Sequence, residues 1–190
     1  MKIAIVGAGT IIFTDEGVGV YAAKYLSENY DFEGDVTIVD GGVLGFGLMN
    51  YYQDYDYVFI LDTITIEDHP GSIYVIPSDE LLGLGSYKQT AHEVEIVEML
   101  EICSLLEKIA DITIIGIVPE DIQTVGVNLT QTLKMEFSKF VGETLKQLDK
   151  LKIGYTKNSK DIGLEEIIAT YANPQTMREI KNDQTNNHIQ

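Results

Sequence analysis

The opening stretch, residues 2–26, constrains the fold most: an apolar strand runs into a glycine turn and then into a helix that follows two acids. Residues 2–6 form a β-branched run typical of a strand. Gly7 and Gly9 supply the backbone freedom of a tight turn. The apolar positions of the next segment have the spacing of a helix packed on a sheet: Val18, Tyr21, Ala22 and Tyr25.

The glycine turn has two possible ligands, a dinucleotide or a cation. Dinucleotide-binding folds carry a GxGxxG motif here, but Ile12 replaces its third glycine. Asp15 and Glu16 would repel a pyrophosphate, which prefers a helix N-terminus free of negative charge. A cation fits better. The alternative, that both acids only cap the helix, stays open.

Further apolar runs predict the rest of a sheet. Residues 35–39, 56–61 and 111–118 read as strands, and residues 72–76 as an edge strand. The run at 56–61 is apolar almost without a break, which is typical of the middle of a parallel sheet. We therefore expect an α/β three-layer sandwich: a twisted, mostly parallel sheet of about five strands with helices on both faces.

Two amphipathic segments predict helices that cover the sheet. One starts at Thr90 and has His92 and Cys103 on its apolar face, and the other is capped by Thr130. Beyond Leu151 the chain becomes polar, apart from an apolar patch at residues 164–171. We therefore predict a single α/β domain over residues 1–151 and a polar, partly disordered C-terminal extension over residues 152–190.

Charge and composition limit the partners. Thirteen basic and thirty acidic residues give a formal net charge of -17, which opposes binding to nucleic acid and to anionic membranes. No apolar run reaches the roughly 18 residues that a membrane helix needs. The single cysteine, Cys103, excludes an internal disulfide framework and indicates a reducing compartment. We expect a cytoplasmic protein with no membrane insertion.

Acids follow the predicted strands at the edge where such sheets bind ligands. Glu16, Asp40 and Asp62 all come after strands, and His92 joins them if its helix starts at the same edge. A lone histidine on an apolar helix face is more often a core residue than a ligand. Two carboxylates, one imidazole and open positions together make a site for a borderline divalent metal. The second histidine of an HExxH motif is replaced by Ile96, which excludes a zincin site.

These residues carry a resemblance to the NiFe-hydrogenase maturation proteases, endopeptidases that remove a C-terminal extension from the hydrogenase large-subunit precursor after nickel insertion. The resemblance covers roughly residues 1–150. It rests on GAGTxxxxDEGVGV at residues 7–20, Asp40-Gly41-Gly42, Asp62, Pro70-Gly71 and His92 at the start of a helix. The chain departs from the family at Thr10, where Asn is usual, and at Glu93, where Gln is frequent.

The resemblance implies that Glu16, Asp62 and His92 are metal ligands and that Asp40 is a further functional acid. It also implies that the divalent metal is nickel presented by the client protein, the large-subunit precursor. No Ser-His-Asp or Cys-His nucleophile pattern is evident in the sequence, and the nucleophile stays open. Two other functions stay open as well: a non-catalytic metal-binding assembly chaperone and a nucleotide-binding oxidoreductase. The client hydrogenase and the oligomeric state do not follow from the sequence.

Overall fold

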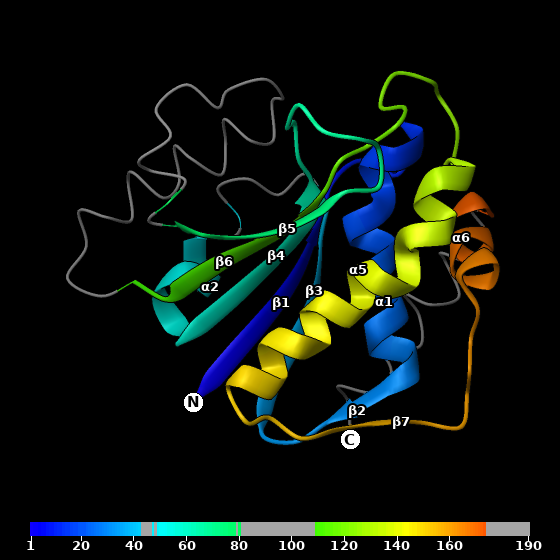
Figure 1. Ribbon diagram of the computed structural model, residues 1–190. Coiled ribbons are helices and arrows are strands. Elements are labelled where there is room, and N and C mark those ends of the chain that lie inside the picture. The colour runs from blue at the N-terminus through cyan, green and yellow to red at the C-terminus, as the bar shows by residue number, and fades with distance from the viewer. Residues whose placement is uncertain (43–46, 48, 79, 81–108, 174–190) are drawn as a thin grey trace.

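A five-stranded sheet forms the middle layer of the protein (Figure 1). The computed structural model describes residues 1–42, 47, 49–78, 80 and 109–173. The strands stand in the order β3-β1-β4-β6-β5, and only the edge pair β5 and β6 is antiparallel. Their bounds are Lys2–Ala8 for β1, Asp35–Gly42 for β3, Tyr57–Thr63 for β4, Ile73–Pro77 for β5 and Asp111–Ile117 for β6.

The central strands are buried on both faces, as their unbroken apolar runs predict. In β4, Phe59 and Leu61 belong to one core cluster, and Val58 and Ile60 belong to a second cluster on the other face. Burial of each such side chain contributes about 1.5–3 kcal/mol. The sheet therefore has two apolar cores, one under each layer of helices.

Helices cover both faces of the sheet (Figure 1). Helix α1 (Val18–Asn29) and helix α5 (Gln131–Lys150) cover one face, and helix α6 (Leu164–Ala172) packs on α1. Helix α2 (Met49–Asp54) places the buried Tyr52 in the second core. The predicted three-layer α/β sandwich is confirmed.

Several predicted boundaries differ from the observed ones. The predicted strands stopped before Asp40 and Asp62, but β3 and β4 run on to Gly42 and Thr63 and include both acids. A short 3₁₀ helix, η1 (Thr14–Gly17), precedes α1. The predicted helix from Thr90 lies outside the described residues. Asp40 and Asp62 are therefore held within the sheet and not in loops, because Asp40 pairs with Gly7 and Asp62 pairs with Gly116.

Part of the predicted C-terminal extension packs against the rest of the protein. Strand β7 (Tyr155–Lys157) pairs antiparallel with β2 (Tyr30–Phe32), a two-stranded sheet that the sequence patterns did not indicate. The apolar patch at residues 164–171 forms most of α6, and its Ile167 and Ile168 are buried. The division of the chain at residues 151 and 152 stays a prediction. In the described part of the chain, no helix is both long enough and apolar enough to cross a membrane.

Helix α1 approaches the sheet so closely that only glycine fits at the contact. A Cβ atom on Gly19 would lie 2.0 Å from the carbonyl oxygen of Leu61 and 2.5 Å from that of Ala8. A Cβ atom on Gly7 would lie 2.3 Å from the carbonyl oxygen of Gly19. Backbone thus packs directly on backbone, and this contact brings the start of α1 to the carboxyl ends of β1 and β4.

Gly19→Ala is therefore expected to lower the free energy of unfolding by about 3 kcal/mol, because the added methyl group would displace the backbone of Leu61 or Ala8. Gly142→Ala is the matched control: Gly142 is also helical, and a Cβ atom there meets nothing within 4 Å. The control should gain up to about 1 kcal/mol from better helix propensity. Urea unfolding of the variants measures both values, and wild-type stability of Gly19→Ala would contradict the close contact.

Candidate functional site

The candidate site surrounds Gly9, in the turn that follows β1. Gly9 has a φ of 119°, a conformation that strongly favours glycine. A Cβ atom there would lie 1.8 Å from the carbonyl oxygen of Glu16 and 3.7 Å from Oδ1 of Asp62. The Gly9 N–H donates to the carbonyl oxygen of Gly42 at 3.0 Å. One turn therefore joins η1, the end of β4 and the end of β3.

Asp62 is a buried carboxylate near the end of β4. Its exposed fraction is 2%. The N–H of Thr63 donates to its Oδ1 at 2.7 Å. Strand alternation places its side chain on the same face as Val58 and Ile60, opposite to the face that α1 covers. Because an ionised carboxylate at such depth must be stabilised by hydrogen bonds or by a cation, Asp62 suits a ligand role.

Glu16 lies in η1 and is partly buried. Its N–H donates to the carbonyl oxygen of Phe13 at 3.0 Å, and its own carbonyl oxygen lies against Gly9. The structure thus brings the backbone of Glu16 and the carboxylate of Asp62 to the same glycine. In the ranges that the structure describes, no group of three or more His, Cys, Asp or Glu is placed to hold a metal ion. The third predicted ligand, His92, lies outside those ranges, so the ligand set stays a prediction.

Asp15 has a structural role that sequence reasoning missed. Its side chain is fully buried. Its Oδ2 accepts hydrogen bonds from the N–H groups of Glu120 and Asp121 at 3.0 and 2.9 Å, and from the Thr130 hydroxyl at 3.0 Å. Its Oδ1 accepts from the Thr130 N–H at 2.7 Å. Thr130 is the N-cap of α5, so Asp15 holds the start of α5 and does not cap α1, which has no side-chain cap. The suggestion that Asp15 caps the helix that follows it is therefore wrong.

The first residue of η1 is held in a strained conformation by contacts with residues 119–130. Thr14 has a positive φ of 39°, which costs a non-glycine residue about 1–3 kcal/mol. Its hydroxyl donates to the carbonyl oxygen of Thr124 at 2.7 Å, and its N–H donates to that of Gly126 at 3.1 Å. The N–H of Gly126 in turn donates to the carbonyl oxygen of Ile12 at 2.9 Å. Residues 119–130 thus set the position of η1 and, with it, that of Glu16.

Asp40 belongs to the same edge but to the other face of the sheet. Asp40 lies two residues after Ile38 in β3, so the two side chains share a face. Ile38 packs in the core under α1, whereas Asp62 points to the opposite face. The Asp40 carboxylate is exposed and accepts a hydrogen bond from the Tyr171 hydroxyl at 3.1 Å. The two aspartates therefore do not share one face, and the predicted functional role of Asp40 stays a prediction.

Tyr171, from α6, is another residue that the sequence patterns did not single out. Its ring meets Tyr21 of α1 edge to face, with 5.6 Å between the ring centres. Burial of the ring, together with the charge of Asp40, raises the pKa of Tyr171 well above its usual range. Burial also raises the pKa of Tyr21 to about 12. Both hydroxyls therefore keep their protons at neutral pH.

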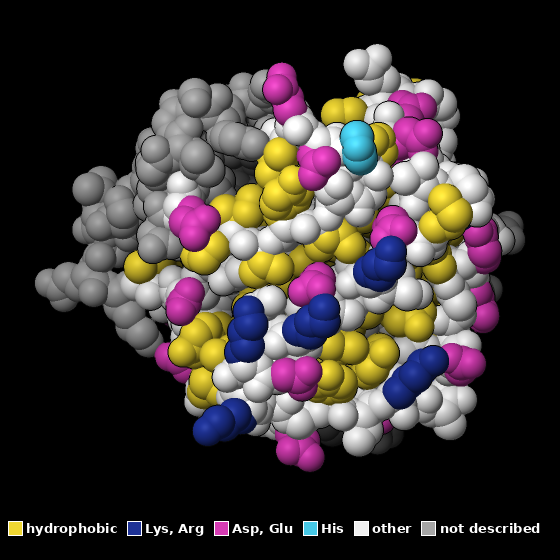
Figure 2. Space-filling model, in the orientation of Figure 1, with side chains coloured by type: hydrophobic (Ala, Val, Ile, Leu, Met, Phe, Trp, Pro, Cys, Tyr) yellow, Lys and Arg dark blue, Asp and Glu magenta, His cyan; other side chains and the backbone are white. Residues whose placement is uncertain are grey.

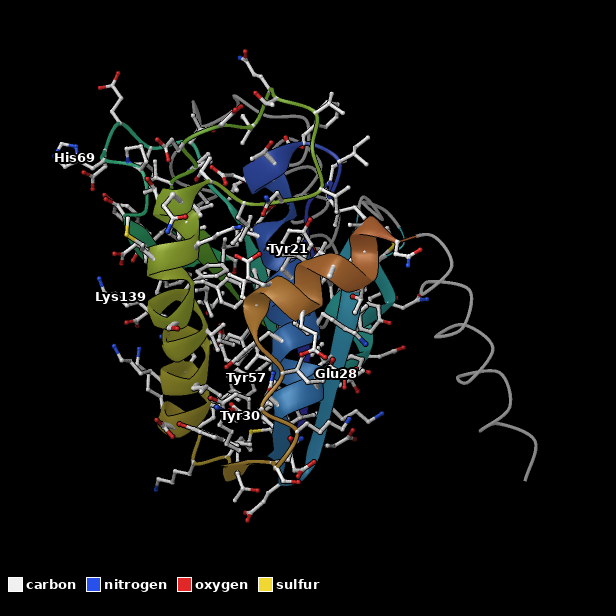
Figure 3. The ribbon with its side chains drawn as sticks, turned by 90° about the vertical axis from the view of Figure 1, so that its right-hand side faces the viewer. Tyr21, Glu28, Tyr30, Tyr57, His69 and Lys139 are labelled. Atoms are coloured by element: carbon white, nitrogen blue, oxygen red, sulfur yellow. The ribbon has the colours of Figure 1, made fainter. Side chains whose placement is uncertain are left out.

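Charges are unevenly distributed over the face shown in Figure 2. Lysines lie over the middle and lower parts of this view, mixed with acids. On α5, Lys139 pairs with Glu136 and Lys146 pairs with Glu143. Among the described residues, the upper part of this view, where the parallel strands end, shows acidic side chains and no Lys or Arg. His69 lies in the exposed loop at this end (Figure 3). This edge therefore favours a cation over an anion.

The family model described as hydrogenase maturation protease matches residues 20–147. The chain belongs to the hydrogenase maturation protease family. The matched residues of this hydrogenase maturation protease include Asp40, Asp62 and His92, and Glu16 lies just before them. The chain is thus a peptidase of hydrogenase maturation, which decides against a nucleotide-binding oxidoreductase.

Similar proteins agree with this assignment. Hydrogenase expression/formation protein HupD of Rhizobium leguminosarum bv. viciae is 30% identical over 135 residues, which cover 70% of this chain and 67% of that protein. Hydrogenase 2 maturation protease of Escherichia coli is 27% identical over 136 residues, 70% of this chain and 82% of that protein. The structure of the Escherichia coli hydrogenase maturating endopeptidase HybD shares the fold, with a TM-score of 0.78 and 24% identity over 85% of this chain and 100% of that chain.

Asp15→Asn is expected to lower the free energy of unfolding of this hydrogenase maturation protease by about 3 kcal/mol. The amide would remove the charge that accepts three backbone N–H groups and would turn a donor toward at least one of them. Asp111→Asn is the control, because Asp111 is exposed, and its effect should stay within about 0.5 kcal/mol. Urea unfolding compares the two variants. Equal stability would show that Asp15 does not hold the loop.

Proposed function

We propose that this protein removes the C-terminal extension of a NiFe-hydrogenase large-subunit precursor, in the cytoplasm and after nickel has been inserted into that precursor. The buried carboxylate of Asp62 beside Glu16, at the Gly9 turn of a chain that belongs to this family, carries the proposal. The acidic strand edge supports it, since it favours a bound cation (Figure 2).

Nickel is part of the substrate in this proposal. Glu16, Asp62 and His92 complete the coordination of a nickel ion that the precursor already holds. Carboxylate and imidazole groups suit a borderline divalent metal, and three ligands leave positions for those of the precursor. The protein thereby recognises a precursor whose metal site is filled.

Rigid placement of the ligands is the contribution of this chain. Asp62 is fixed by its strand and by the N–H of Thr63. Glu16 is held by η1, which the Asp15 contacts tie to the start of α5. Because these ligands are already in place, they need no further ordering when the precursor binds. Binding then holds the scissile bond at the site and lowers the entropic cost of cleavage.

The nickel requirement gives a direct test. Nickel-free precursor leaves the acidic site without the cation that holds the precursor, so binding is weak and cutting is slow. Wild type is expected to release the C-terminal peptide from nickel-loaded precursor only, and His92→Ala from neither form. Mass spectrometry follows the released peptide. Equal cutting of nickel-free precursor by wild type would contradict the nickel requirement. Failure of wild type to cut nickel-loaded precursor would instead indicate a non-catalytic chaperone.

Glu16→Gln and Asp62→Asn should each lower the cleavage rate. The loss should exceed the roughly 10–100-fold that follows removal of a residue that only hydrogen-bonds to a metal ligand. Each substitution keeps the shape of the side chain but removes the charge that attracts nickel. Glu120→Gln is the matched control, because Glu120 is an exposed acid just after β6, at the same edge. The control should cut at the wild-type rate. Thermal unfolding checks folding, and collapse of both ligand variants would assign these acids to stability alone.

A further inference from the structure

A contact between the last described helix and the end of β3 extends the candidate site. The Tyr171 hydroxyl donates to Oδ2 of Asp40 at 3.1 Å across 131 residues of sequence. In the part of the chain that the structure describes, Asp40 has no other hydrogen-bond partner for its side chain. The phenol therefore fixes one carboxylate oxygen and leaves Oδ1 available.

Tyr171 is held firmly enough to orient the group that it contacts. Figure 3 shows α6 lying across α1, with Tyr21 beside it. The side chain of Asn29 fastens the chain before α6 through two hydrogen bonds with the backbone of Ile162, at 3.0 and 2.6 Å. On the side toward α5, Lys134 pairs with Glu165 at 2.8 Å. The position of Tyr171 is thus set from both neighbouring helices.

Asp40 is close to the Gly9 turn in space, because it pairs with Gly7 where β3 lies beside β1. It lies two residues before Gly42, whose carbonyl oxygen accepts the hydrogen bond from Gly9. Its Oδ1 lies 3.8 Å from the point where a Cβ atom of Gly42 would stand, so this oxygen is directed along β3 toward the strand end. The carboxylate is exposed and can therefore reach a bound partner.

We infer that Tyr171 is a positioning residue of the cleavage site: it holds Asp40 so that Oδ1 accepts a backbone N–H of the precursor segment to be cut. This inference rests on the proposed function. An ionised carboxylate is an acceptor only, and the backbone N–H is the donor that every peptide segment offers. The Tyr171 hydroxyl donates to Oδ2 of Asp40, so Oδ1 keeps its acceptor capacity for the substrate.

The variant Tyr171→Phe tests the inference, because it removes the hydroxyl and keeps the ring that packs on Tyr21. With nickel-loaded precursor, kcat should fall about tenfold, the effect of losing one hydrogen bond to a charged group. KM should stay within about twofold, since nickel contacts dominate binding. Tyr155→Phe is the matched control: its hydroxyl also donates to an aspartate, Asp149, at 3.2 Å, but it lies in β7, and its cleavage should equal that of wild type.

A double-mutant cycle separates positioning from mere packing. Asp40→Asn should lower kcat at least as much as Tyr171→Phe, and the double variant should be no slower than Asp40→Asn. A merely structural hydroxyl would shift the melting temperature and leave this coupling at zero. The melting temperature of Tyr171→Phe is therefore measured beside the kinetics.

Three results would overturn the inference and leave the proposed function intact: wild-type kcat for Tyr171→Phe, wild-type kcat for Asp40→Asn, or additive losses in the double variant. Failure of the wild type to cut nickel-loaded precursor would overturn the proposed function, on which the inference depends. A coupled loss in kcat with unchanged Tyr155→Phe would support the role of Tyr171.

Discussion

The direct contact of backbone with backbone between α1 and the sheet is the constraint on which the rest of the structure depends. No side chain larger than hydrogen fits at Gly19 against the carbonyl oxygens of Leu61 and Ala8. At Gly9 the same close packing meets the carbonyl oxygen of Glu16. Because α1 and η1 lie this close to β1 and β4, an acid from the start of the helix and an acid from the end of a strand come to one turn.

Two neighbouring acids in the opening motif have different tasks. Asp15 is fully buried and satisfies the N–H groups of a distant loop and of the start of α5, whereas Glu16 stays partly accessible at the turn. The first stabilises the local fold, and the second is the acid that we propose as a nickel ligand. This division explains how a chain with a net charge of -17 can place an acid in its core, since hydrogen bonds offset the cost of burying it.

Local patterns predicted the parts of the structure that local forces decide. The strands β1, β4 and β6, the Thr130 cap and the layered α/β fold follow from apolar runs and helical spacing, and all are observed. The partners of Asp15 lie 105 to 115 residues away and that of Asp40 lies 131 residues away, and no periodicity in a single sequence reports such contacts. The β2–β7 pair also joins distant segments, and each strand has only three residues, too few for a recognisable alternation. Glu16 and Asp62 were chosen as ligands by resemblance and by their place after strands, and the structure brings both to Gly9.

Recognition of the precursor's nickel by Glu16 and Asp62 is the claim on which the function depends. X-ray absorption at the nickel K edge tests it most directly, on a complex of this protein with a nickel-loaded precursor whose scissile bond has been made uncleavable. Binding of wild type is expected to add oxygen or nitrogen ligands to the nickel, and the double variant Glu16→Gln, Asp62→Asn should leave the coordination of the free precursor unchanged. A nickel spectrum that stays the same when wild type binds would contradict this recognition.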